Sequence, residues 1–187
     1  MLKALFASAA LLALTGAASA QTAVPVPPFT SVELRGGGHV VLKYGPAQRV
    51  TLLKGDLGHT SFEVRDGHKL VIDACNRSCW GRYDLEIEIV TPRIAGAAVD
   101  GGGHVESAGG FPAQGRIDAA VEGGGHVDLR TIDAASAEAA VDGGGHVLIR
   151  AEHALNAAVN GGGSIEYWGN PQLTSAVNGG GSVSRGS

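Results

Sequence analysis

The sequence has no surplus of basic residues, no long apolar run beyond its first twenty residues and only two cysteines. Its 14 Lys and Arg residues are outnumbered by 18 Asp and Glu residues. Because a negative surface repels polyanions, we expect no nucleic-acid partner. A membrane-spanning helix needs about 20 apolar residues, so we expect no transmembrane anchor in the mature chain.

The apolar run that does occur lies at the N-terminus and is typical of a secretory signal peptide. Met1 and Lys3 form a short basic start, residues 4–14 are apolar and uncharged, and the small-residue motif ASA ends at Ala20. We predict cleavage between Ala20 and Gln21, with export to the periplasm, the cell surface or the medium. Loss of Lys3 leaves 13 of the 14 basic residues against 18 acidic ones, a net charge of −5.

The two cysteines, Cys75 and Cys79, lie close together in the segment CNRSC. In an exported chain oxidation is the default, so we predict a local disulfide between them. Half of a metal site and a pair of free thiols are the alternatives. The lack of a second cysteine pair argues against the metal site.

Glycine, by contrast, is abundant, and 18 of the 30 glycines form six triplets. The triplets start at residues 36, 101, 123, 143, 161 and 179, with spacings of 65, 22, 20, 18 and 18 residues. From the second triplet on, a valine precedes each triplet by two residues, and Val or Ile follows it by two. These apolar brackets indicate ordered turns rather than flexible linkers. Repeats of this length predict a solenoid of stacked units.

The segments between the triplets are rich in Val and Ala and lack helical periodicity, so we predict short parallel strands stacked about 4.8 Å apart. The predicted fold is all-β, a right-handed parallel β-solenoid that forms one domain over residues 21–187. Residues 93–187 are its glycine-triplet coils.

Residues 29–92 have longer alternating strands, such as HVVLKY and SFEVRDG, and turn signals such as Asp66-Gly67. We expect this part to add about three coils between the first and second triplets, with the first triplet in the same column as the others. A separate β-sandwich is the less favoured alternative.

If the bracketing valines point inward, the residue next to them points outward. Stacking then aligns a ladder of histidines, continued by Ser164 and Ser182, beside a column of acids, continued by Asn160 and Asn178. Imidazoles beside carboxylates can bind Zn²⁺, Cu²⁺ or Ni²⁺, although a row of ligands is not a closed cage. The candidate ligands are His39, His104, His126, His146, Asp100, Glu122 and Asp142. The alternative is that repetition has propagated a tolerated surface residue.

Other chemistry is poorly supported by the sequence. The GGxGxD repeat of calcium-binding β-rolls and the threonine ladder of ice-binding proteins are both absent. The acidic column is compatible with a polysaccharide-cleaving enzyme. However, no Ser/His/Asp set or arginine cluster breaks the repeat, so we predict no catalytic residues and no required cofactor. Tyr167 and Trp168 are either a sugar-stacking platform or the cover of a coil edge.

The order of these features resembles a known bacterial family. FTSVELRGGGHVVLKYGPAQRVTLLKGD, VRDGHKLVID, DLEIEIVTPRIAGAAVDGGGHV and the later glycine-rich coils are similar to the putative auto-transporter adhesin, head GIN domain family. The resemblance implies an exported β-solenoid-like protein and transfers no catalytic residue. In the family the turn usually reads Gly-Ser-Gly before Asp or Asn, whereas here Gly-Gly-Gly precedes His in four of six cases.

The expected function is therefore an exported, non-catalytic interaction or adhesion module at the cell envelope, whose ligand is an unidentified protein or glycan. A periplasmic protein that binds divalent metal through the histidine ladder is the alternative. Both ends of a solenoid expose strand edges, which predicts end-to-end association into homo-oligomers.

Overall fold

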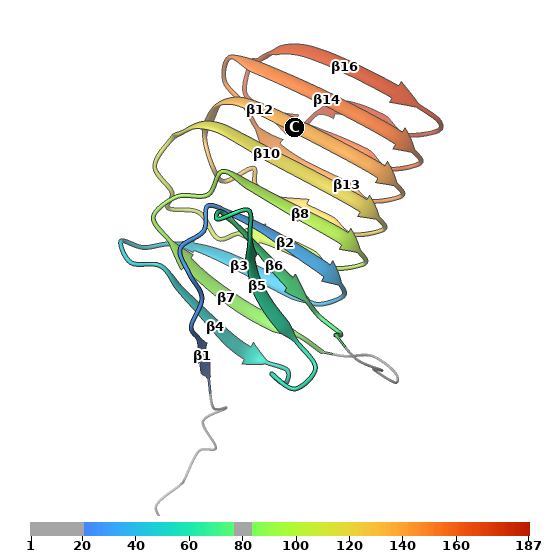
Figure 1. The fold of residues 1–187 in the computed structure, drawn as a ribbon. Coiled ribbons are helices and arrows are strands. Elements are labelled where there is room, and N and C mark those ends of the chain that lie inside the picture. The colour runs from blue at the N-terminus through green and yellow to red at the C-terminus, as the bar shows by residue number, and fades with distance from the viewer. Residues whose placement is uncertain (1–20, 77–83) are drawn as a thin grey trace, which may run out of the picture.

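The computed structural model describes residues 21–76 and 84–187, and these form strands, turns and loops without a helix (Figure 1). It follows that no helix in the described ranges could span a membrane. The strands belong to a nine-stranded and an eight-stranded sheet, both mostly parallel. The all-β fold with parallel stacking is confirmed, while right-handed winding as a solenoid stays a prediction.

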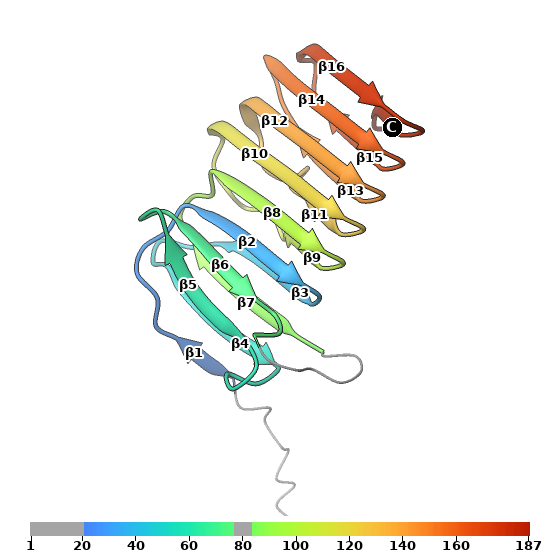
Figure 2. The same ribbon diagram turned by 45° about the vertical axis from the view of Figure 1, so that its right-hand side comes forward.

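The nine-stranded sheet contains, in spatial order, β1 (Thr22–Val24), β4 (Arg49–Lys54), β7 (Glu86–Thr91), β3 (His39–Tyr44), β9 (His104–Ser107), β11 (His126–Asp128), β13 (His146–Arg150), β15 (Ser164–Trp168) and β17 (Ser182–Arg185). The eight-stranded sheet contains β16 (Gln172–Asn178), β14 (Ala154–Gly161), β12 (Ala134–Gly143), β10 (Gln114–Gly123), β8 (Gly96–Gly101), β2 (Ser31–Gly36), β6 (Lys69–Asp73) and β5 (Ser61–Arg65). Figure 2 shows the two sheets as facing layers.

Each glycine triplet joins a strand of the eight-stranded sheet to one of the nine-stranded sheet. The strands before the triplets pair in register, so that Val99, Val121 and Val141 form one column. These valines are at most 2% exposed and face the apolar core between the sheets. The apolar brackets of the second to fifth triplets are therefore core residues, as predicted, whereas Val177 before the sixth triplet is exposed at the end of the stack.

Stacking of the turns explains why glycine is needed at two of the three triplet positions. Gly143 has a φ of +115°, and a Cβ atom there would lie 2.6 Å from the carbonyl oxygen of Gly123 in the turn below. A Cβ at Gly145 would lie 2.7 Å from the carbonyl oxygen of Gly125. At Gly144 nothing lies within 4 Å. Glycine at the first and third positions thus permits the close approach of the stacked backbones, whereas the middle position does not require glycine.

The expectation of coils between the first and second triplets is wrong. Strands β2 and β3 lie directly beside β8 and β9, so Gly36 pairs with Gly101 and the first triplet does share the column. The intervening chain lies on the other side of β2 and β3. There β6 pairs in parallel with β2 and β7 with β3, but β4 pairs antiparallel with β7, and β5 pairs antiparallel with β6. Asp66 and Gly67 both have positive φ, which suits the tight turn that reverses the chain between β5 and β6.

Candidate functional site

The outer face of the nine-stranded sheet carries the predicted histidine ladder. Strand pairing places His39 opposite His104, His104 opposite His126, and His126 opposite His146. The ring centroids of these successive pairs are 5.0, 4.5 and 6.2 Å apart. The neighbouring valines are fully buried, so the alternation of inward Val and outward His occurs as expected. Ser164 continues the ladder beyond His146.

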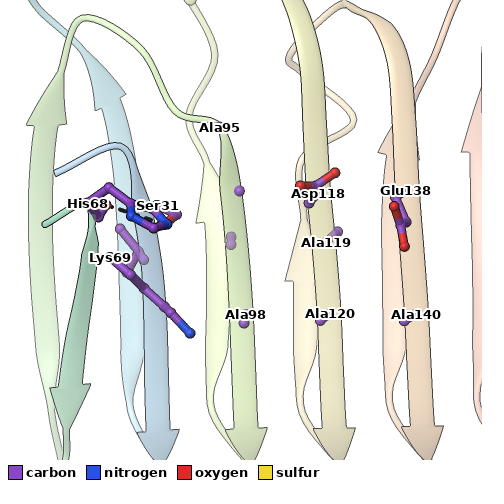
Figure 3. A pocket seen from close by; sticks show the side chains of 13 residues that line it. Ser31, His68, Lys69, Ala95, Ala98, Asp118, Ala119, Ala120, Glu138 and Ala140 are labelled. Atoms are coloured by element: carbon purple, nitrogen blue, oxygen red, sulfur yellow. Dashed lines mark hydrogen bonds between the residues drawn. The ribbon is translucent and has the colours of Figure 1, made fainter. Parts of the chain in front are cut away.

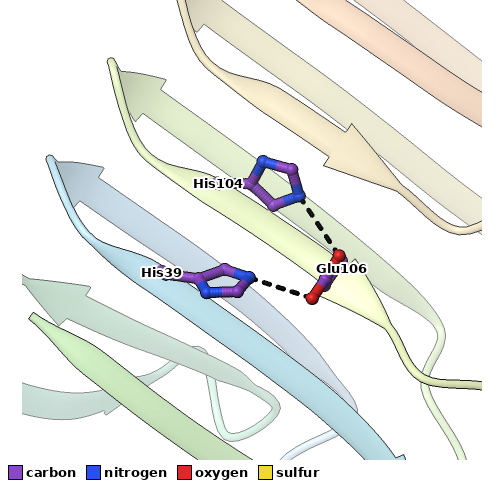
Figure 4. A group of neighbouring side chains, drawn as sticks. All are labelled: His39, His104 and Glu106. Atoms are coloured by element: carbon purple, nitrogen blue, oxygen red, sulfur yellow. Dashed lines mark hydrogen bonds and ion pairs between the residues drawn. The ribbon is translucent and has the colours of Figure 1, made fainter.

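At one end of the ladder three potential metal ligands lie close together, namely the rings of His39 and His104 and the carboxylate of Glu106 (Figure 4). His39 Nε2 lies 3.1 Å from Glu106 Oε1, and His104 Nε2 lies 3.6 Å from Glu106 Oε2. All three ligand atoms lie within 4.8 Å of one another. Glu106 is not among the ligands predicted from the sequence. Its signal was its position two residues after His104, which places both side chains on the same face of β9.

The other two histidines have different neighbours. His126 stacks on His104 with an interplanar angle of 23°. In the register column of Glu106, the strand of His126 carries Asp128, which is 9% exposed and pairs with Arg130 at 3.0 Å. The strand of His146 carries Leu148 at that register position. The ladder therefore becomes poorer in carboxylate ligands away from Glu106.

The electrostatics of the ladder disfavour protonation at its centre. Burial lowers the pKa of His104, the charge of His39 lowers it further, and Glu106 and Asp128 act in the opposite direction. The pKa of His126 is also lowered, by burial and then by His104, against the effect of Asp128; His146 and Arg130 lower it further.

The predicted acidic ligands lie elsewhere. Asp100, Glu122 and Asp142 form an exposed column on the eight-stranded sheet, on the other side of the glycine turns from the histidines. None of the three belongs to the His39, His104 and Glu106 group. Asn160 continues their column, with its Nδ2 3.4 Å from Asp142 Oδ1.

Beside this acidic column runs a shallow groove with a floor of alanine. Its floor is a register column of Ala98, Ala120, Ala140, Ala158 and Ala176. The acidic column is one wall. The other begins with Asp118 and Glu138, which Figure 3 shows on β10 and β12, and continues to Asn156. Two hollows of about 380 and 400 Å³, which share Ala120 and Ala140, lie over the alanines, and the first also has Lys69 in its lining. We call this feature the alanine groove.

The aromatic pair near the C-terminus shows features of an edge cover. Tyr167 packs against the core cluster and is only partly exposed. The guanidinium of Arg130 lies 5.4 Å from the centroid of the Trp168 ring. One face of Trp168 is therefore already engaged by a side chain from the neighbouring repeats.

Two further predictions fall wholly or partly on residues outside the described ranges. The signal peptide, with its cleavage site after Ala20, precedes Gln21, where the described chain begins. Of the predicted disulfide, Cys75 lies within the described residues and Cys79 does not. Both assignments stay predictions.

Comparison with known proteins supports the resemblance seen in the sequence. Residues 113–171 match the family described as "Putative auto-transporter adhesin, head GIN domain", which confirms that resemblance. No curated protein sequence matches the chain.

Among solved structures, a putative adhesin from Bacteroides fragilis is 17% identical, with a TM-score of 0.53 over 89% of this chain and 96% of that one. A putative adhesin from Parabacteroides merdae is 10% identical, with a TM-score of 0.38 over 90% of this chain and 96% of that one. A putative cell adhesion protein from Clostridium sporogenes is 10% identical, with a TM-score of 0.40 over 89% of this chain and 98% of that one. At 17% identity, the likeness to the Bacteroides fragilis protein concerns the fold alone.

Proposed function

We propose that the protein is an exported, non-catalytic interaction module of the adhesin type, built as a right-handed β-solenoid, that binds a basic, extended segment of a partner protein in the alanine groove. The observation that carries this proposal is the groove itself. Methyl side chains leave its floor low over five adjacent strands, and Asp100, Glu122 and Asp142 line one wall. On the other wall Asp118 and Glu138 are paired with Arg116, so the acidic column carries the negative charge of the groove.

The dimensions and charge of the groove favour an extended cationic peptide. Five strands about 4.8 Å apart give a floor of roughly 19 Å, which is the length of about six residues of extended chain. Asp100, Glu122 and Asp142 repeat along one wall at the strand spacing. Complementary charge of this kind steers association and sets specificity.

Export and adhesion fit together in this proposal. A signal peptide would deliver the chain to the periplasm or cell surface, and the family match is to a group described as adhesins. Both outer faces repeat the same residue types from strand to strand, which suits recognition of an extended partner more than a localised reaction.

The test uses two synthetic peptides of eight residues, one alternating Lys and Thr and one alternating Glu and Thr, together with neutral oligosaccharides. We expect the purified chain to bind only the Lys peptide, with an affinity that falls as salt rises. The double variant Glu122→Lys, Asp142→Lys should lose this binding, whereas Glu166→Lys on the other sheet should keep it. Equal binding by both variants, or binding of oligosaccharides alone, would overturn the proposal.

The last strands supply a second contact surface, for another copy of the chain. All residues of β16 are exposed, among them Leu173 at 37% and Val177 at 46%. An exposed apolar strand edge is prone to pair with another chain. We propose that copies associate end to end through β16, and Val177→Lys should then abolish a concentration-dependent rise in mass measured by sedimentation. A monomer at every concentration would refute it.

A further inference from the structure

The three side chains at the start of the histidine ladder have the chemistry of a transition-metal site. Two imidazoles and one carboxylate form a ligand set that zinc uses in sites with three protein ligands and a fourth open position. The two histidines come from strands far apart in sequence, His39 from β3 and His104 from β9, which pair in the sheet. Glu106 comes from β9 and faces both rings.

The spacing of the ligand atoms is close to that of a tetrahedral site. With metal–ligand bonds of about 2.0–2.1 Å, neighbouring ligand atoms in a tetrahedron lie about 3.4 Å apart. The two nitrogen-to-oxygen distances around Glu106 are 3.1 and 3.6 Å. A ring nitrogen of His39 and one of His104 are within 4.8 Å of each other. Small side-chain rotations would therefore bring all three atoms onto one ion.

A second observation concerns the hydrogen bonding of His104. Among the described residues its Nε2 is the one buried side-chain nitrogen or oxygen atom without a hydrogen-bond partner. This nitrogen faces Glu106 at 3.6 Å, which is too long for a hydrogen bond. Burying an unpaired polar atom costs about 1–3 kcal/mol. Coordination to a cation would satisfy this nitrogen without any change in the sheet.

The charge around Glu106 also suits a cation. Neighbouring acids on this face have strong basic partners, since Glu88 pairs with Lys43 at 2.7 Å and Asp128 with Arg130 at 3.0 Å. Within residues 21–76 and 84–187, the ion-pair partners of Glu106 are only the two imidazoles. Glu106 thus keeps a charge available for a metal ion.

We propose that His39, His104 and Glu106 bind one divalent transition-metal ion of the Zn²⁺ and Cu²⁺ class. The ion ties β3 to β9, and so links the N-terminal part of the fold to the first of the later glycine-triplet repeats. Each histidine ligates through Nε2 and Glu106 through a carboxylate oxygen, and solvent completes the coordination. This binding is local to one end of the ladder rather than spread along its four histidines.

The experiment is calorimetric titration of the purified chain, prepared without a histidine tag and stripped of metal, with Zn²⁺, Cu²⁺ and, as a control, Mg²⁺. We expect one site for Zn²⁺, tighter binding of Cu²⁺, and no heat with Mg²⁺, which prefers oxygen ligands. Glu106→Gln keeps the size of the side chain but removes its charge, and should weaken Zn²⁺ binding by at least about tenfold.

The matched control is His146→Ala, which removes a histidine of the same ladder away from Glu106. Its Zn²⁺ affinity should equal that of the unmodified chain. At the same concentration, Zn²⁺ should also raise the Tm of the unmodified chain and of His146→Ala more than that of Glu106→Gln, because tighter binding gives a larger stabilisation. The proposal would be overturned if His146→Ala and Glu106→Gln lost Zn²⁺ affinity equally, or if Glu106→Gln bound Zn²⁺ as tightly as the unmodified chain with its fold intact. The alanine groove lies on the other sheet, so its peptide test succeeds or fails independently.

Discussion

Alanine substitutions in one glycine triplet test the account of the turn, because adjacent positions differ in what a methyl group would meet. At Gly143 the φ of +115° is unfavourable for an L residue, and the new Cβ would lie 2.6 Å from a backbone oxygen. The conformation costs about 1–3 kcal/mol, and displacing the packed turn costs about 1–3 kcal/mol more. Gly143→Ala should therefore destabilise the protein by about 2–6 kcal/mol.

Gly144→Ala is the matched control, since its Cβ has open space and its φ is not positive. Alanine there restricts the unfolded chain and should stabilise the protein by about 0.4–1 kcal/mol. For a chain of this size each kcal/mol shifts Tm by about 2–4 °C. Thermal unfolding followed by circular dichroism should thus lower Tm by at least about 4 °C for Gly143→Ala and leave or raise it for Gly144→Ala. Equal shifts would refute the reasoning.

Three further predictions concern the core, the surface and the ladder. Ile149→Ala removes a fully buried side chain and should cost about 2–5 kcal/mol in urea unfolding. Arg116→Ala breaks exposed ion pairs and should leave the urea midpoint unchanged; a clear loss would contradict the view that they are solvent-screened. Because the folded-state pKa values of His104 and His126 are lowered, the unfolded chain binds more protons below about pH 6.5, so stability should fall as pH drops through that range. Replacing both by Asn should flatten this slope, and an unchanged slope would contradict it.

The repeats of residues 93–187 were predictable because the same sequence pattern recurs in each of them. A valine two residues before each of the second to fifth triplets marked a core position, and the constant offset made the register of β8, β10, β12 and β14 readable from the sequence alone. In the N-terminal part, HVVLKY and SFEVRDG were also correctly predicted as strands, namely β3 and β5. In the repeats, the local sequence pattern and the tertiary structure agree.

The order of the N-terminal strands was not predictable in this way. The 65 residues between the first two triplets are enough for about three coils, but this length does not say whether the chain continues the stack or turns back. The Asp66-Gly67 turn signalled reversal between β5 and β6, yet the parallel pairing of β6 with β2 is a long-range contact. Only tertiary packing decides on which side of β2 such a strand adds.

Only the repeated residues of the candidate site could be predicted from the sequence. The ladder of four histidines followed from repeat offsets and strand alternation. Glu106 has no counterpart of its own type in the next two repeats, where Asp128 and Leu148 pair in its column, and glutamate recurs there only at Glu166, so the repeat pattern does not mark it. A site confined to one end of the ladder, as proposed here, is not marked by repeated residues, whereas the acids of the repeat form a column along the other sheet.

The acidic wall of that groove has an electrostatic cost that bears on its function. Adjacent carboxylates about 4.8 Å apart repel by roughly 1 kcal/mol in water. Asn160 and Asn178 hold the same column in the last two repeats without this repulsion, so the fold accepts an amide there. Glu122→Gln should therefore raise Tm slightly while weakening the binding of a Lys-rich peptide. A variant that gains stability and binds the peptide as well as before would show that the acids of this wall do not serve a cationic partner.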